Sequence, residues 1–286
     1  MGNYIEPAQI VEQDMNTSDR SKFGPPDDTP IMPWYGGAYS HGFVALHPFF
    51  TVEGLDPNTC EHGTLILSRS SAPSSLSLLE WADEEAAKRR AGKEITPQGV
   101  DGLAKRLGQR IGWRTVCQQS KFADDCELDR ALRTSIDGLR HDLADTAASD
   151  RLASYCSRNG IFAPTEGSFQ PLMQFSLASI FRRAGFRNLI VGDEFGDDER
   201  LVDISLLERN ELWDGTAGLP ANGIKRLIAP DRSLLAWVHW DSFYTLILGA
   251  ANALHDLETD RLFEGFWCSD KTDTYWLTQS SIPHVQ

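Results

Sequence analysis

The segment from Trp237 to Gly249 places residues that can do chemistry inside an otherwise apolar run. His239 and Asp241 are two positions apart, and Ser242 follows directly. In a strand this spacing puts both side chains on one face, where a carboxylate can orient an imidazole as a general base or a metal ligand. His239, Asp241 and Ser242 are therefore the candidates for a catalytic site.

The neighbouring residues favour a second interpretation of the same segment. Four bulky aromatic residues surround the polar ones: Trp237, Trp240, Phe243 and Tyr244. Such residues are typical of a core, where a polar side chain must find a hydrogen-bond partner because burying it unpaired is costly. We expect His239 and Asp241 to form a buried structural pair at the end of a strand, with catalysis as the alternative.

An acidic loop is the second place where the residue types could do chemistry. Residues 193–199 hold five carboxylates in seven positions, and hard cations such as calcium prefer oxygen ligands of this kind. The candidate metal ligands are Asp193, Glu194, Asp197 and Asp198. The ligand spacing of an EF-hand is absent, and a solvated hairpin loop explains the composition equally well. We predict no metal and no cofactor.

Recognised catalytic motifs are missing from the sequence. It contains no G-x-S-x-G, G-x-x-x-x-G-K-[ST], G-x-G-x-x-G or H-E-x-x-H pattern, so the common hydrolase, nucleotide-binding and zinc-protease classes have no support. His41, His47 and His62 lie near one another and near Cys60, but without a recognised spacing of zinc ligands. We expect surface or turn histidines.

Charge and cysteine usage limit the partners and the compartment. A net charge of −14 argues against binding to nucleic acid or to an anionic membrane surface, and it permits a basic protein partner. Five dispersed cysteines without a C-x-x-C pair indicate reduced thiols. Residues 1–13 lack the features of a secretory signal, and no apolar run is long enough to span a bilayer. We expect a cytoplasmic protein.

The elements that position these residues suggest an α+β fold. Residues 1–33 are acidic and rich in proline, which predicts a flexible arm before a single α+β domain at 34–286. A helical middle, at about 75–185, is predicted to pack on a mostly antiparallel sheet formed by N-terminal and C-terminal strands. The expected helices are 75–90, one beginning at Thr96-Pro97, 127–143, one ending at Asn159-Gly160, and 169–184.

Short extended segments lie on either side of the helical middle. They are predicted at 42–46, 64–67, 188–191, 200–207, 224–229 and 234–239. The turn-forming residues 230–233 would join the last two strands as a hairpin.

Four short motifs point to a family. Leu46–Phe49, Ala131–Ile136, Pro164–Gly167 and the segment from His239 to Gly249 occur in this order. Together they resemble a bacterial family known as domain of unknown function 2711, over most of the chain after the arm. The resemblance implies a bacterial source. It carries no established activity, so it transfers no functional residues.

These observations favour a protein without catalytic activity that binds another protein. Acidity and abundant aromatic residues suit an interface with a basic partner, and an immunity or antitoxin role is the most concrete form of this hypothesis. The alternative is a hydrolase with a site around His239, Asp241 and the acidic loop at 193–199.

Overall fold

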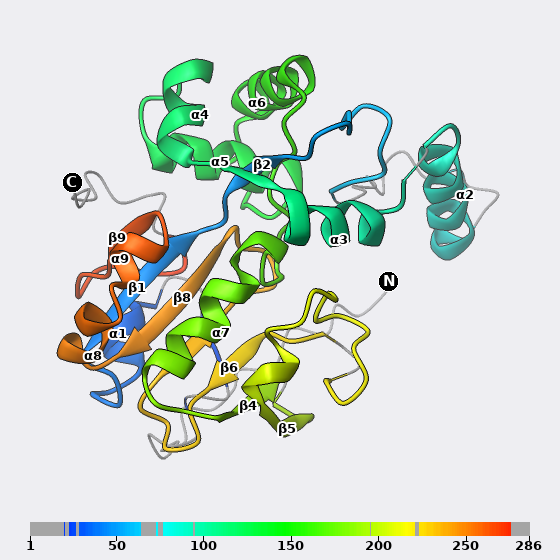
Figure 1. Ribbon diagram of the computed structural model, residues 1–286. Coiled ribbons are helices and arrows are strands. Elements are labelled where there is room, and N and C mark those ends of the chain that lie inside the picture. Colours follow the sequence, from blue (N-terminus) through cyan, green and yellow to red (C-terminus); the bar gives the residue numbers. More distant parts are fainter. Residues whose placement is uncertain are drawn as a thin grey trace, which may run out of the picture.

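A seven-stranded antiparallel sheet lies at the centre of the protein (Figure 1). The computed structural model describes residues 20, 23–26, 29–63, 73, 77–93, 95–194, 196–220 and 223–275, so the predicted strand at 64–67 lies outside the described residues. The sheet has the order β5-β4-β6-β7-β8-β1-β9. Its strands are β1 (His41–Leu46), β4 (Asn188–Gly192), β5 (Glu199–Asp203), β6 (Arg226–Ile228), β7 (Leu235–Trp237), β8 (Tyr244–Gly249) and β9 (Gly265–Trp267).

The N-terminal strand β1 pairs with strands from the far end of the chain. Val44 lies opposite Leu246 of β8 on one side and opposite Phe266 of β9 on the other. All of β1 except His41 is buried, which explains its continuous apolar sequence. This arrangement confirms the predicted α+β fold with one mostly antiparallel sheet built from both ends of the chain.

Helices cover both faces of the sheet. Leu235 and Trp237 of β7 face a core that includes α1, α4, α5 and α6, whereas Ala236 faces a second core that includes α7. This alternation is the period-2 pattern of a strand. The helices are α1 (Ile31–Trp34), α2 (Leu78–Arg90), α3 (Pro97–Leu107), α4 (Trp113–Ser120), α5 (Asp125–Ser135), α6 (Thr146–Asn159), α7 (Gln174–Arg183), α8 (Ala251–Asp256) and α9 (Thr259–Leu262).

Beside the main sheet, β2 (Phe49–Thr51) and β3 (Gln109–Ile111) form a two-stranded pair. None of the helices in the described ranges has both the length and the apolar character of a membrane span.

The predicted helix boundaries are confirmed where a local cap sets them. Ser77 and Glu80 form a reciprocal capping box before α2. The Thr96 side chain accepts a hydrogen bond from the backbone of residue 99, and Pro97 takes the first position of α3. Helix α6 ends at Gly160, whose φ of 65° is the left-handed conformation that glycine adopts without strain.

Boundaries without a strong cap differ from the prediction. The predicted helix at 127–143 is wrong beyond Ser135, because Asp137 has a φ of 55° and turns the chain. Leu139 and Leu143 instead pack near Tyr275 in a small separate cluster. The predicted helix at 169–184 starts later than expected, as a 3-10 turn at Pro171–Met173 that leads into α7.

The strand predicted at 200–207 is β5 followed by a 3-10 turn at Ile204–Leu206.

The described residues before position 34 contact the domain. Ile31 is fully buried, and its N–H donates to the carbonyl oxygen of Thr272 at 2.8 Å. Gly24 lies against the Trp237 ring so closely that a Cβ atom there would be 1.8 Å from Cζ2. Helix α1 therefore begins three residues before the predicted domain boundary.

Candidate functional site

The segment from His239 to Ser242 is a turn between β7 and β8, and the strand predicted at 234–239 ends at Trp237. The Ser242 N–H donates to the carbonyl oxygen of His239 at 3.2 Å. The chain must reverse here because β7 and β8 pair antiparallel, with Trp237 opposite Leu246. The turn still brings the two predicted partners together: His239 Nδ1 and Asp241 Oδ1 are hydrogen-bonded.

Ser242 does not complete a catalytic triad with this pair. It is fully buried, and its hydroxyl donates to backbone carbonyl oxygens, 3.0 Å from that of His239 and 3.2 Å from that of Tyr244. A nucleophilic serine needs its hydroxyl bonded to the ring of the base. The geometry therefore assigns Ser242 to holding the turn.

Arg133 of α5 is a further member of this site that the sequence did not single out. It is 1% exposed, and its Nε donates to Asp129 Oδ2 at 2.8 Å. Its Nη1 lies 3.9 Å from Asp241 Oδ1, and its Nη2 donates to the Thr274 carbonyl oxygen at 2.8 Å. One guanidinium thus connects helix α5, the β7–β8 turn and the C-terminal part of the chain. The spacing of four residues between Asp129 and Arg133 on one helix was the available signal.

Burial controls the ionisation of this network. Desolvation raises the pKa of Asp129 to about 6, against the opposing effect of Arg133. Burial alone would lower the pKa of Arg133, but the carboxylates of Asp129 and Asp241 and the phenol of Tyr244 raise it on balance. The guanidinium is held in its charged form between two carboxylates.

All four motifs that carry the family resemblance meet at this turn. Arg133 belongs to one of them. The Gly167 N–H donates to the Ser242 carbonyl oxygen at 3.0 Å, and a Cβ atom at Gly167 would lie 2.1 Å from the carbonyl oxygen of Trp240. The His47 N–H donates to the Phe243 carbonyl oxygen at 2.8 Å. These segments are distant in sequence, and the turn is the point where they are joined.

The acidic loop is organised by its own side chains and by Arg226. Asp193 Oδ1 accepts hydrogen bonds from the N–H groups of residues 196 and 197, at 2.8 and 3.2 Å. Both Asp198 oxygens accept from Arg200, at 2.8 and 2.7 Å. Glu194 is partly buried and Asp197 is exposed. Within the described ranges, no group of three or more His, Cys, Asp or Glu residues is placed to hold a metal ion.

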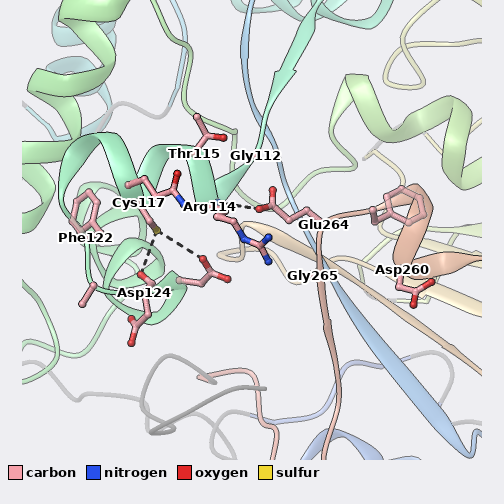
Figure 2. A pocket seen from close by; sticks show the side chains of 13 residues that line it. Gly112, Arg114, Thr115, Cys117, Phe122, Asp124, Asp260, Glu264 and Gly265 are labelled. Carbon is pink, nitrogen blue, oxygen red and sulfur yellow. Dashed lines mark hydrogen bonds between the residues drawn. The ribbon is translucent and has the colours of Figure 1, made fainter. Parts of the chain in front are cut away.

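An open pocket of about 630 Å³ lies elsewhere, between the starts of α4 and α5 and the segment that joins α9 to β9 (Figure 2). Neither His239 nor Asp241 lines it. Its charged lining residues are four acids and one base: Asp124, Asp125, Asp260, Glu264 and Arg114. The residues of this pocket share no motif, so the sequence did not indicate it.

Glu264 fixes one wall of this acidic pocket. Its carboxylate accepts from the backbone N–H groups of Trp113 at 2.7 Å and of Arg114 at 3.0 Å, which caps the N-terminus of α4. Gly112 permits this approach, because a Cβ atom there would lie 2.5 Å from Glu264 Oε2. Asp124 caps α5 in a similar way through the backbone N–H of Glu127 at 2.9 Å.

The thiol in the acidic pocket is not an activated nucleophile. Cys117 Sγ lies 3.5 Å from the Asp124 carbonyl oxygen and 3.8 Å from Asp125 Oδ1. Burial and the nearby carboxylates raise the pKa of Cys117 far above its usual value, which disfavours the thiolate. The pocket is suited to electrostatic binding of a cation.

Comparisons with known proteins give a family and one relative. The family model described as "Protein of unknown function (DUF2711)" matches residues 27–278. The chain is 22% identical to "Uncharacterized protein YwbB" of Bacillus subtilis (strain 168) over 198 residues, which are 68% of this chain and 82% of that protein. No solved structure matches. The match to the family model spans nearly the whole chain and confirms the resemblance, so the chain belongs to the DUF2711 family.

Proposed function

We propose that this protein is a non-catalytic binding module, and that its acidic pocket receives a lysine or arginine side chain of a basic partner protein. The observation that carries the proposal is the charge of the pocket, which four acidic residues and one arginine line. The net charge of −14 supports it, because a field of one sign attracts a partner of the opposite sign and speeds encounter. A small basic toxin, held by an immunity-like protein in the cytoplasm, is the most concrete form of such a partner.

The carboxylates of the pocket are suited to binding rather than to acid–base chemistry. Glu264 and Asp124 are bonded to backbone N–H groups, which fixes the direction of each carboxylate. Asp260, on the first turn of α9, is exposed at the rim and accessible to an incoming cation. Because these carboxylates are already oriented and Asp260 is exposed, the pocket can bind a basic group without rearrangement.

The proposal is tested by measuring fluorescence anisotropy with a labelled oligolysine peptide, with an oligoglutamate peptide as the reference. Asp260→Lys should weaken oligolysine binding about fivefold, since an exposed ion pair contributes up to about 1 kcal/mol. Glu84→Lys is the matched control, because Glu84 is also exposed but lies on α2, on the opposite side of the molecule from α9 (Figure 1). Equal losses in the two variants, or equal binding of both peptides, would contradict the proposal.

The alternative function, a hydrolase, is supported by one observation: Asp241 orients the imidazole of His239, whose side chain is 14% exposed. A histidine held in this way can act as a general base toward a water molecule. Assay of the purified chain against chromogenic esters and phosphoesters tests this function. Turnover that disappears in His239→Gln and persists in Ser242→Ala would favour it over the binding module.

A further inference from the structure

The bonding of the carboxylates in the acidic pocket distinguishes a lysine from an arginine. Three acids of its lining are exposed: Asp124, Asp260 and Glu264. The guanidinium of arginine is planar and pairs best with both oxygens of one carboxylate, whereas the ammonium of lysine is a compact charge with three rotatable donors. The base that the pocket prefers therefore depends on which carboxylate oxygens are already engaged.

Both oxygens of Glu264 already accept hydrogen bonds from the start of α4 (Figure 2). Oε2 accepts from the Trp113 N–H at 2.7 Å, and Oε1 accepts from the Arg114 N–H at 3.0 Å. A carboxylate oxygen has a further acceptor position, so an ammonium can still bind to either one. The paired bonds of a guanidinium need both oxygens at once and would compete with the two backbone N–H groups.

The other two exposed acids give an arginine little advantage. Asp124 Oδ1 accepts from the Glu127 N–H at 2.9 Å, so one oxygen of this carboxylate is also engaged. Asp260 lies on the first turn of α9 at the exposed rim, where water screens an ion pair with either base.

The aromatic residues of the pocket do not favour an arginine either. A guanidinium gains affinity by stacking on an aromatic face. The two aromatic lining residues, Phe122 and Phe263, are each only 5% exposed. The guanidinium carbon of Arg151 already lies 4.2 Å from the centroid of the Phe122 ring. A guanidinium from a partner would therefore gain little by stacking here.

We propose that the acidic pocket selects a lysine side chain of the partner over an arginine, and that the bonds between Glu264 and the start of α4 set this preference. The preference rests on the binding function proposed above, because it concerns the same pocket. On an acidic surface with free carboxylates, arginine binds at least as well as lysine, since it forms paired bonds and is more weakly hydrated. Net charge alone does not produce a preference for lysine.

Fluorescence anisotropy of the full chain with labelled oligolysine and oligoarginine peptides of equal length tests the preference. Oligolysine should bind roughly two- to fivefold more tightly, which is the range of one exposed ion pair. Equal or tighter binding of oligoarginine overturns the preference for lysine and leaves the proposed function intact. If neither peptide binds more tightly than oligoglutamate, the proposed function is overturned as well.

Gly112→Ala tests the cause of the preference. A Cβ atom at Gly112 would lie 2.5 Å from Glu264 Oε2, so the carboxylate, at the end of a flexible side chain, must move away from α4. With both oxygens released, oligoarginine should bind roughly two- to fivefold more tightly than it binds to the native chain, and oligolysine should change less.

The matched control is Gly102→Ala on α3, where a Cβ atom would meet no described atom within 4 Å. It should leave both affinities unchanged. A preference for lysine that persists in Gly112→Ala, or that decreases equally in the two variants, overturns the role of Glu264. The comparison of the two peptides on the native chain keeps the preference testable if Gly112→Ala fails to fold.

Discussion

Two buried arginines, Arg133 and Arg226, organise the two segments whose composition first suggested chemistry. Arg133 serves the β7–β8 turn and lies between two carboxylates that are themselves buried. Arg226 serves the acidic loop, where its Nε donates to the Asp193 carbonyl oxygen at 2.9 Å and its Nη1 lies 3.1 Å from Glu199, whose side chain is 22% exposed. Each arginine pairs with acidic residues of its segment.

The difference between the two sites shows in their ionisation. The carboxylates around Arg133 raise its pKa on balance, whereas burial lowers the pKa of Arg226 although the carboxylates of Glu199 and Asp193 oppose this effect. The charged groups around Arg133 are all buried and join layers of the fold, whereas Glu199 beside Arg226 is partly exposed and belongs to a loop. In these two segments the acidic residues are therefore explained by the arginine that they surround, which sequence spacing alone does not reveal.

The largest effect is expected from Arg133→Met. The change removes the cation from two buried carboxylates, and loss of one partner of a buried ion pair costs about 3–5 kcal/mol. Urea denaturation followed by circular dichroism should show this loss in the free energy of unfolding. If Arg133→Met lowered the free energy of unfolding less than Arg226→Met does, the difference between the two sites would be contradicted.

Arg226→Met is expected to cost less, roughly 1.5–3 kcal/mol. Glu199 can turn to water when its partner is removed, so the main loss is the bond to the Asp193 carbonyl oxygen and the order of the loop. The same denaturation experiment gives the free energy, and limited proteolysis should locate new cleavage at 193–199. Arg182→Met, which breaks an exposed pair with Glu208, is the control and should cost at most about 1 kcal/mol.

Asp241→Asn should cost about 1 kcal/mol of stability. The amide oxygen can still accept from His239, and Arg133 keeps Asp129 and the Thr274 carbonyl oxygen. Thermal unfolding measures the change. If the hydrolase function held, the same variant would lose turnover with its melting temperature almost unchanged, which separates a catalytic role of Asp241 from a structural one.

The last prediction concerns the pH dependence of stability. The pKa of Asp129 is raised from 3.8 to about 6, so between these pH values the folded state binds more protons than the unfolded state. The contribution of Asp129 to stability is therefore greatest below pH 3.8 and decreases as the pH rises to about 6. Denaturation of the native chain and of Asp129→Asn across this interval should show a steeper decrease in the native chain, because Asp101, whose pKa burial also raises to about 6, is present in both. Parallel profiles would contradict a raised pKa.

Local chemistry made part of the fold predictable from sequence. The capping box at Ser77, the Thr96-Pro97 start and the Gly160 stop are set by residues within one helical turn, and each occurs where expected. The spacing of Leu139 and Leu143 suits a helix and therefore predicted a helix that is too long. In the structure both residues belong to a separate cluster with Tyr275. Apolar spacing alone does not say which core a side chain joins.

The candidate sites were less predictable, because long-range contacts create them. The sequence indicated that His239 and Asp241 could meet, and they are hydrogen-bonded. It could not show that Arg133, more than a hundred positions earlier, would face Asp241. The acidic pocket is lined by residues from segments that are remote along the chain, so no spacing within one segment signals it.

The position of β1 between β8 and β9 has a consequence for biosynthesis. Strands β4 to β8 come from one stretch of the chain and can pair as it leaves the ribosome, but β1 has no strand partner until Tyr244–Gly249 has been made. Protein synthesis proceeds at roughly 5–20 residues per second, so β1 has no strand partner for about 10–40 s. During that interval the nascent chain exposes the apolar residues Phe43, Val44 and Leu46 to chaperones, and the sheet can close only after β8 has been synthesised.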